Sequence, residues 1–277
     1  MKTLKDKVVV ITGAGSGIGR ALAVEVARRG SLVAVSDVDE AGLAETVELV
    51  KAAGAPEVRA DRIDVADRAA FAAYALAVRE HFGRVNVIVN NAGVTMTGDF
   101  EEITYDDFEW IMSINFWGVV TGTKEFLPHL IESGDGHVVN ISSLFGLVSM
   151  PGQSTYNASK YAVRGFTEAL REEMLINQRP VGVTCVHPGG IKTGISRNGR
   201  KVASLDTEEL DSLFEKKLAR MEPSRAAQII VRGIEKNQAR VLVGIDAHLF
   251  HHAAKLAGSR YQDVVARGHK RIAPPAK

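Results

Sequence analysis

The sequence predicts a single α/β domain with a doubly wound, mostly parallel seven-stranded sheet and helices on both faces. Three observations predict this fold. Seven short apolar, β-branched runs alternate with six helical patterns along the chain. A cluster of glycines joins the first run to the first helical pattern. No Pro- or Ser-rich linker and no repeat divides the 277 residues. Strands that alternate with helices form right-handed βαβ crossovers, and these build a parallel sheet.

The elements are expected in a regular order. Strands are expected at 8–12, 32–36, 58–63, 85–90, 137–142, 181–186 and 240–244. Helices are expected between them at 17–30, 40–53, 67–82, 104–132, 155–177 and 224–237. Asp67 and Thr104 are residue types that cap helix N-termini. Gly30, Gly54 and Gly83 stand where helices should end, because glycine adopts the left-handed conformation of a C-terminal cap.

Two segments depart from this alternation. Residues 194–222 carry a short helical patch, and in this fold class a loop at that place can close over substrate. We therefore expect a cofactor-binding and catalytic domain over 1–244, including loop 194–222, and a helical tail over 245–277. The tail has apolar residues at helical spacing, namely Leu249, Phe250, Ala253, Leu256 and Ala257. An isolated short helix is marginal in water, so we expect this stripe to be covered. It either roofs the substrate pocket, which we favour, or lies against a neighbouring subunit.

Composition and charge exclude several classes of partner. The net charge is +1, so no strong attraction to nucleic acid or to an anionic membrane is expected. No run reaches the length of a membrane span, and no signal peptide is visible. The only cysteine, Cys185, cannot form an intrachain disulfide, and its apolar surroundings predict a buried structural thiol. We expect a cytoplasmic protein without nucleic-acid or membrane partners.

The segment from Thr12 to Gly19 predicts a turn that binds a pyrophosphate. A buried strand, four glycines and a helix follow one another there. The helix N-terminus offers unpaired amides and a positive dipole end, and the glycines let the backbone approach the phosphates. The spacing is T-G-x-x-x-G-x-G and not the strict G-x-G-x-x-G. The alternative is an ordinary strand-to-helix turn. The candidate residues are Gly13, Ser16, Gly17, Ile18 and Gly19.

Tyr156 and Lys160 predict proton transfer. They lie four residues apart, so on a helix they share one face. An ammonium beside a phenol favours the phenolate and lowers the tyrosine pKa, which lets the phenol exchange a proton with an alcohol oxygen. Ser143, thirteen residues before Tyr156, can hold the same oxygen. Asn115 lies in an apolar helical run, and a buried asparagine needs hydrogen-bond partners.

Several motifs together resemble those of the short-chain dehydrogenase/reductase family, from about residue 7 to about residue 243. They are the glycine turn, Asn90-Asn91-Ala92-Gly93, the set Asn115, Ser143, Tyr156 and Lys160, and Pro188-Gly189 with Thr193 after it. The resemblance implies a Rossmann fold, a nicotinamide dinucleotide and those four residues as the catalytic set. It gives Asn115 the task of holding a helix distortion and a water that reaches the lysine. Segment 194–222 and the last thirty or so residues carry no family motif.

Asp37 predicts which dinucleotide is bound. It ends the second strand, eighteen residues after Gly19, where an acid hydrogen-bonds the ribose hydroxyls and repels a 2′-phosphate. Neither Val38 nor Ser16 offers a positive charge, so NAD is favoured over NADP. The resemblance implies further cofactor contacts: Asp64 and Val65 at the adenine, Asn91, Ala92 and Gly93 at the cofactor backbone, Tyr156 and Lys160 at the nicotinamide ribose, and Pro188, Gly189, Ile191 and Thr193 beside the nicotinamide.

These residues predict an NAD-dependent oxidoreductase that acts on CH–OH groups and interconverts a secondary alcohol and a ketone. Tyr156 is the expected general acid/base, Lys160 lowers its pKa, and Ser143 orients and polarises the substrate oxygen. An apolar pocket wall, and hence a hydrophobic substrate, is suggested by Leu144, Phe145, Leu147, Val148, Met150 and Pro151. The motif set also resembles that of bacterial secondary-alcohol dehydrogenases and acetoin-type reductases.

Other interpretations stay open. One is a catalytically silent, cofactor-binding regulatory or scaffold protein; another is an epimerase or dehydratase of the same fold. A metal site at His248, His251 and His252 is not expected, because only Asp246 joins them at ligand spacing. Helix 104–132 carries more large apolar residues than one core face requires, which predicts a second buried surface. We expect a homotetramer, with a dimer as the alternative.

Overall fold

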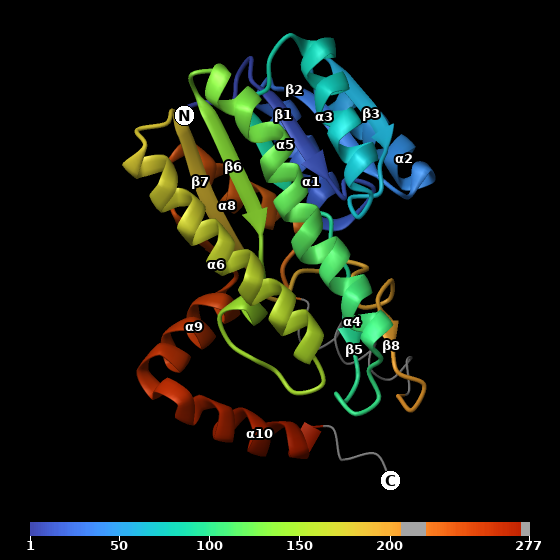
Figure 1. The fold of residues 1–277 in the computed structure, drawn as a ribbon, viewed down its shortest axis with the longest axis vertical. Helices are drawn as coiled ribbons and strands as arrows, with labels where there is room; N and C mark the ends of the chain where they lie inside the picture. Colours follow the sequence, from blue (N-terminus) through green and yellow to red (C-terminus); the bar gives the residue numbers. More distant parts are fainter. Residues whose placement is uncertain (206–219, 273–277) are drawn as a thin grey trace.

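A seven-stranded parallel sheet forms the centre of the molecule (Figure 1). The structure is a computed structural model, and it describes residues 1–205 and 220–272. The strand order is β3-β2-β1-β4-β6-β7-β9. The strands are β1 Val8–Thr12, β2 Leu32–Asp37, β3 Val58–Arg62, β4 Val87–Asn90, β6 Gly136–Ile141, β7 Val181–Pro188 and β9 Arg240–Val243. The predicted doubly wound α/β fold is confirmed.

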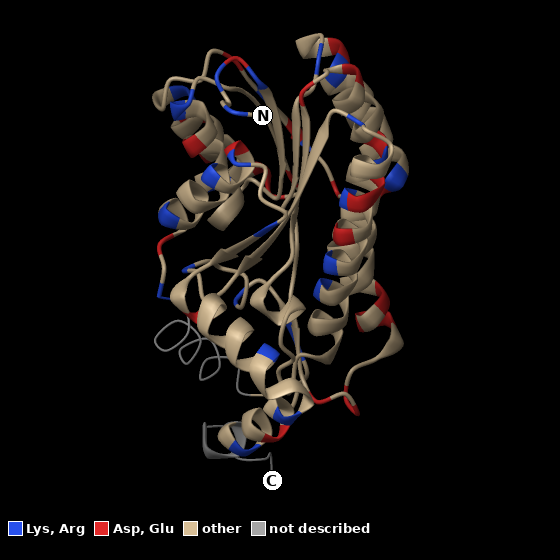
Figure 2. Ribbon diagram, turned by 90° about the vertical axis from the view of Figure 1, so that its left-hand side faces the viewer, with Lys and Arg blue, Asp and Glu red and all other residues tan. Residues whose placement is uncertain are grey.

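Helices cover both faces of the sheet, as the edge-on view of Figure 2 shows. One face carries α1 Gly17–Arg28, α2 Glu40–Ala52 and α8 Pro223–Glu235. The other carries α3 Arg68–Phe82, α5 Gly118–Glu132 and α6 Ser154–Ile176. The expected caps are present: the side chains of Asp67 and Thr104 accept bonds from backbone amides in the first turns of α3 and of α4 Tyr105–Met112. Gly83 ends α3 in the left-handed conformation.

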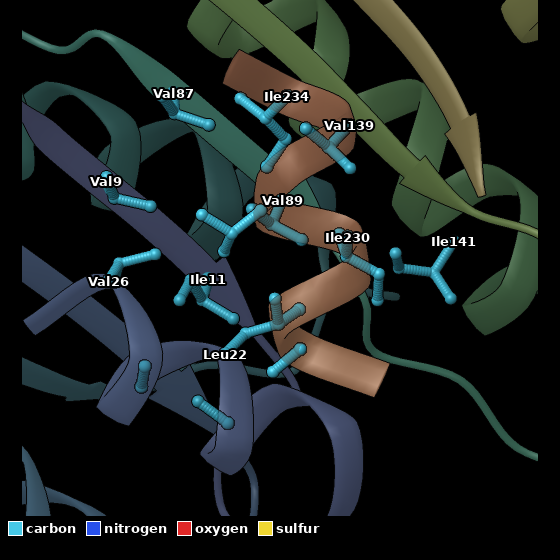
Figure 3. Packing of buried hydrophobic residues seen from close by; sticks show 14 of the residues in the cluster. Val9, Ile11, Leu22, Val26, Val87, Val89, Val139, Ile141, Ile230 and Ile234 are labelled. Carbon is cyan, nitrogen blue, oxygen red and sulfur yellow. The ribbon is translucent and has the colours of Figure 1, made fainter. Parts of the chain in front are cut away.

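Alternation along the strands divides the core into two clusters. Val9 and Ile11 of β1 point to the face of α1 and α8, where they meet Leu22 and Ile230 (Figure 3). Val10 points to the opposite face and joins a cluster that includes residues of α3 and α5. Adjacent strand residues face opposite sides of a sheet, so an uninterrupted apolar run is buried on both. Burial of each such aliphatic side chain stabilises the folded state by roughly 1.5–3 kcal/mol relative to leaving it exposed.

The topology brings several loops to one edge of the sheet. All seven strands are parallel, so their carboxyl ends lie at the same edge. From β1 the chain adds strands in one direction to β3 and then, from β4, in the other. In such sheets the ligand crevice opens where the order reverses. The loops after β1, β4, β6 and β7 therefore surround a candidate site.

Two features differ from the sequence-based expectation, and a third expectation is not tested. The helix expected at 104–132 is divided into α4 Tyr105–Met112, a π-helical turn Ser113–Trp117, and α5. Two short strands, β5 Met96–Thr97 and β8 Arg200–Lys201, pair in a separate parallel sheet that the sequence did not predict. The helical patch expected within 205–221 lies mostly outside the described residues.

The tail consists of α9 Ile245–Ala257 and α10 Tyr261–Ile272, joined by a 3-10 turn. Its apolar contact with the main body is made by Ala247, Ala254 and Tyr261, which pack against the chain after β6. The expectation that the stripe is covered is wrong for the single chain: Leu249 is 64% and Leu256 89% exposed. Alanine side chains allow a closer helix approach than leucine, so the helix docks on its alanine face and leaves the leucines outside.

Cys185 is buried in β7, as expected, and burial raises its pKa to about 12. None of the helices in the described part of the chain combines the length and the apolar character that a bilayer-spanning helix needs.

Candidate active site

The glycine turn after β1 brings backbone amides to the edge of the sheet. Gly13 and Gly17 have positive φ angles of 63° and 54°, which glycine adopts without strain. A Cβ on Gly13 would lie 2.6 Å from the Cα of Ala92, so the turn and the loop after β4 pack too closely for a side chain. Ser16 is the N-cap of α1, and its side chain makes no capping bond. An anion at the start of α1 therefore meets unpaired amides and a serine hydroxyl.

Asp37 lies beside this turn at the end of β2. Its carboxylate accepts a bond from the Gly15 amide at 2.7 Å and another from the Asp39 amide at 3.0 Å. A carboxylate has about four acceptor positions, so it retains capacity for ribose hydroxyls. Val38, next in the chain, is 52% exposed and uncharged.

Two arginines lie near Asp37. Arg62 is its partner in the neighbouring strand β3 and pairs with Glu40 at 3.3 Å. The Arg20 guanidinium donates to the carbonyls of Gly15 and Gly42 and to the Thr46 hydroxyl, and it pairs with Glu45. These contacts take up four of its five donors. The surroundings of Asp37 thus suit neutral hydroxyls better than a phosphate.

The loop after β4 is fastened to the glycine turn. The Thr12 hydroxyl accepts bonds from the amides of Asn91 and Ala92, at 3.0 and 3.1 Å. The Asn91 side chain donates back to the carbonyls of Thr12 and Gly13, both at 2.9 Å. A Cβ on Gly93 would lie 3.1 Å from Asn115 Oδ1 and 3.3 Å from Lys160 Nζ. A side chain at this position would therefore crowd the polar atoms of Asn115 and Lys160.

The loop after β7 closes the other side of the turn. It follows Pro188 and Gly189, and its Ile191 is buried and forms an isolated parallel bridge with Met221. A Cβ on Gly17 would lie 3.1 Å from the Thr193 methyl carbon. The structure therefore brings the loop of Pro188–Thr193 together with the glycine turn, as the motifs predicted.

Asp64 and Val65 lie after β3, at the same edge. Val65 is buried and packs against Gly118 at the start of α5. Asp64 is exposed, and it accepts hydrogen bonds within its own turn, from the amides of Ala66 and Asp67. Their position next to β2 is compatible with an adenine contact, but their hydrogen bonds do not connect them to the other candidates.

Ser143, Tyr156 and Lys160 meet at the end of β6. Ser143 caps the 3-10 turn Leu144–Gly146, and its side chain hydrogen-bonds the Tyr156 hydroxyl. Tyr156 is 9% exposed, and Lys160 Nζ lies 5.6 Å from the centre of its ring. The ammonium donates to the Ile141 carbonyl at 3.1 Å. A phenol, a hydroxyl and an amine thus converge in one small volume, which is the chemistry needed to move a proton to or from a substrate oxygen.

The pKa of Tyr156 differs from the sequence-based expectation. Burial raises it, and the hydrogen bond with Ser143 opposes that rise. Burial also lowers the pKa of Lys160, to about 8. Removal from water disfavours the charged form of each group. In this geometry desolvation, and not the nearby lysine, dominates the titration of Tyr156.

Asn115 occupies the middle of the π-helical turn and is fully buried. Its amide donates to the Val94 carbonyl at 2.9 Å and to the Ser159 hydroxyl at 3.1 Å, and it accepts from the Val94 amide at 2.8 Å. These bonds tie the turn to the loop after β4 and to α6. The helix distortion that the family resemblance implied at Asn115 is therefore present.

Two further residues contact the candidate residues: Ser159, which the sequence left unassigned, and His187, whose place before Pro188 predicted a structural role close to the site. Ser159 joins the network, because its hydroxyl donates to the Tyr156 carbonyl at 2.8 Å. His187 is fully buried, and its Nδ1 lies 2.9 Å from the Ser143 carbonyl oxygen. Burial lowers the His187 pKa to about 4, so the ring is neutral and donates to that carbonyl. The signal for His187 in the sequence was its place directly before the Pro-Gly pair at the end of a strand.

The apolar wall around Tyr156 differs in part from the one expected. Phe145 contacts the tyrosine ring edge-to-face at 6.1 Å, as a pocket residue would. Leu144 and Val148 instead pack against the tail. Around Tyr156 lie apolar residues from other segments: Met96, Ile111 and Val202, with Val94, Ile103, Trp110, Met112 and Leu205 beside them.

The histidines of the tail lie close together without forming a metal site. The rings of His248 and His252 are 6.5 Å apart and those of His251 and His252 5.1 Å apart. Among the residues that the structure describes, no three His, Cys, Asp or Glu side chains are grouped in a way that could hold a metal ion.

Comparisons with known proteins give consistent matches. The family model for short chain dehydrogenases matches residues 7–203. A Mycobacterium tuberculosis protein named as an oxidoreductase, SadH, is 53% identical over 277 residues, which span the whole of both chains. A short-chain dehydrogenase/reductase from Burkholderia phymatum, solved in complex with NAD, has a TM-score of 0.84 and 32% identity and covers 96% of this chain and 97% of its own. The structure of a levodione reductase has a TM-score of 0.77 and 31% identity, over 89% of this chain and 98% of its own.

Proposed function

The chain belongs to the short-chain dehydrogenase family of oxidoreductases, and from this premise we propose that it interconverts a secondary alcohol and a ketone with NAD as its cofactor. The observation that carries the proposal is the convergence of Ser143, Tyr156 and Lys160 beside Gly93, at the edge where the glycine turn also lies. Residues 1–244 carry binding and catalysis, and 245–277 form a tail.

The proposed roles follow from the geometry. Tyr156 exchanges a proton with the substrate oxygen, and Ser143, already bonded to its hydroxyl, holds that oxygen in place. Lys160 lies between the Ile141 carbonyl and the tyrosine ring, where it can also bind the nicotinamide ribose. Asn115 fixes the π-helical turn against the loop after β4. The bound nicotinamide supplies the hydride chemistry.

NAD is the proposed cofactor because of what surrounds Asp37. Its carboxylate can accept from ribose hydroxyls, Val38 is uncharged, and Arg20 is occupied by other partners. A 2′-phosphate placed here would meet the Asp37 carboxylate, and the two nearby arginines, Arg20 and Arg62, are paired with Glu45 and Glu40. The Burkholderia relative was solved with NAD, which supports the same choice.

A hydrophobic ketone or alcohol is the proposed substrate class. The wall around Tyr156 is built from Phe145, Met96, Val202 and further apolar side chains. A charged substrate group would lose its hydration against such a wall, which costs binding free energy. Buried apolar area of the substrate instead contributes about 25 cal/mol per Å² to the binding free energy. The levodione reductase, named for a dione, supports a ketone substrate.

Replacement of Tyr156 by Phe tests the proposal. The variant loses only the hydroxyl, so we expect turnover to disappear while the Kd for NADH stays within about twofold, because the phenol acts on the proton. NADH absorbance with a panel of secondary alcohols and ketones measures turnover, and NADH fluorescence measures binding. A variant within a few-fold of wild-type activity would exclude Tyr156 as the acid/base.

The same panel tests the alternative function. A catalytically silent regulatory protein would bind NADH but oxidise or reduce no member of the panel. The four catalytic residue types and their mutual contacts favour the enzyme. An epimerase or dehydratase would convert substrate without net NADH change.

We further propose a homotetramer, with a dimer as the alternative. Trp117, at the end of the π-helical turn, is 45% exposed, and Phe116 beside it contacts Phe166 of α6. Exposed aromatic surface on two adjacent helices favours a subunit interface. A reducing compartment such as the cytoplasm fits the single, buried Cys185.

A further inference from the structure

A carboxylate from the tail holds the loop after β7. Asp246 lies in the first turn of α9, and its Oδ2 accepts a hydrogen bond from the Gly190 amide at 2.6 Å. Hydrogen bonds to an ionised acceptor are shorter and about twice as strong as neutral ones. Gly190 belongs to the Pro188–Thr193 loop, so this contact joins the tail directly to the candidate cofactor site.

Two glycines make the space that this carboxylate occupies. A Cβ on Gly189 or on Gly244 would collide with the Asp246 carboxylate. Gly244 also has a φ of 111°, which side-chain-bearing residues rarely adopt. Both glycines flank the carboxylate, one from the loop and one from the end of β9. The packing therefore admits the Asp246 carboxylate only because neither neighbour has a side chain.

Further contacts of the loop connect Gly190 to the glycine turn. The Gly190 carbonyl accepts bonds from the amides of Arg220 and Met221, at 3.0 and 3.2 Å. The next residue, Ile191, is buried and pairs with Met221. Thr193 then packs against Gly17. With Gly190 held on both its amide and its carbonyl, the positions of Ile191 and Thr193 are fixed relative to the start of α1.

We propose that Asp246 is a positioning residue: it orients the Gly190 peptide and thereby the loop residues that face the nicotinamide end of the cofactor. This inference rests on the proposed function. The proposal predicts an effect on one end of the cofactor site only. Loss of the carboxylate should disturb the nicotinamide end of the site, while the adenosine end, built around Asp37 and the glycine turn, keeps its own hydrogen bonds.

A comparison of two ligands separates this role from general stabilisation of α9. ADP-ribose carries the adenosine, pyrophosphate and ribose of NADH but not the nicotinamide. For Asp246→Ala we expect the Kd for NADH to rise roughly tenfold, the size expected for a lost hydrogen bond to a charged group. The Kd for ADP-ribose should stay within about twofold. Asp246→Asn keeps an acceptor oxygen and should fall between wild type and Asp246→Ala for NADH.

Asp263→Ala is the matched control, since it removes an exposed acid from the first turn of α10, and it should change neither Kd. Calorimetry measures both ligands on the full-length protein. Equal weakening of NADH and ADP-ribose by Asp246→Ala would show a structural role and overturn the proposal, as would unchanged NADH binding. A wild-type protein that binds neither ligand would overturn the proposed function itself.

Discussion

At the scale of single residues, we propose that Asp37 sets the preference between the two nicotinamide dinucleotides. We expect Asp37→Ala to weaken the binding of NAD. The ratio of kcat/KM for NAD to kcat/KM for NADP should also fall, because the variant no longer repels a 2′-phosphate. Val38→Arg in the same background should shift it further, since residue 38 is exposed next to the carboxylate. Steady-state kinetics with both cofactors measure the ratio. A wild type that prefers NADPH would contradict the role given to Asp37.

His187 makes a second residue-scale prediction, on stability against pH. Burial lowers its pKa from 6.5 to about 4. Between these values the unfolded chain binds a proton that the folded chain does not, so the free energy of unfolding falls as the pH falls through this window. At pH 5, about 1.5 units below 6.5, the loss due to His187 is roughly 2 kcal/mol. His187→Gln keeps a donor for the Ser143 carbonyl and lacks this titration.

Urea unfolding at pH 7 and pH 5 measures the effect. The stability that wild type loses between the two pH values should exceed the loss of His187→Gln by that amount. Equal losses in the two proteins would mean that His187 titrates normally in the folded state.

The residues proposed to carry the chemistry could be named from the sequence because their spacing and the family motifs place them. Tyr156 and Lys160 share a helix face, and the runs before Ser143 and Asp37 are strands that end at one edge. Their pKa values could not be predicted, because these depend on burial by segments far apart in the chain. The role of Asp246 was missed for the same reason: its partner Gly190 lies 56 residues away.

At the scale of elements, regular periodicity was predictable, whereas local interruptions were predictable only where a family motif marked them, as at Asn115. The apolar pattern of helix 104–132 by itself gave no sign of the π-helical turn Ser113–Trp117. What fixes the turn is the pairing of Asn115 with Val94. The two-residue strands β5 and β8 are too short to produce a pattern, and their pairing depends on packing between Gly98 and Val202.

That packing leads to an element-scale prediction. A Cβ on Gly98 would collide with the side chain of Val202, which belongs to the apolar cluster around Tyr156. We expect Gly98→Ala to displace the segment after β8 and to raise KM for the ketone several-fold, with the Kd for NADH unchanged. Adding Val202→Ala should restore part of the loss, because it removes the colliding methyl groups.

Gly165→Ala is the control for this variant, since a Cβ there meets nothing within 4 Å. It lies within α6 and should stabilise the protein by about 0.5–1 kcal/mol without a change in KM. An unchanged KM in Gly98→Ala would separate the β5–β8 sheet from substrate binding.

At the scale of the whole molecule, the sheet and its two helical layers followed from the alternation of apolar runs, but the placement of the tail did not. Its apolar stripe predicted a covered helix, whereas α9 docks through Ala247 and Ala254. Sequence periodicity identifies a surface that avoids water, but it does not say whether the same chain or another one covers it. The outward position of Leu249 and Leu256 in the single chain favours another chain.

The exposed surfaces lead to the last prediction, on assembly. A tetramer with two-fold axes needs more than one kind of self-complementary interface. The chain exposes two separate apolar surfaces: the aromatic group around Trp117 beside α6, and the leucines of α9. We expect light scattering at micromolar concentration to give a homotetramer. Trp117→Glu and the double variant Leu249→Ser/Leu256→Ser should each reduce it to a dimer.

NADH binding should persist in both variants, because neither surface contains a cofactor contact. A monomeric wild type would refute the assembly. A tetrameric Leu249→Ser/Leu256→Ser variant with altered KM for bulky ketones would place the tail stripe at the substrate pocket instead. The stripe lies opposite the alanine face that docks on the chain after Ser143, so we expect the mass to change and the substrate preference to stay the same.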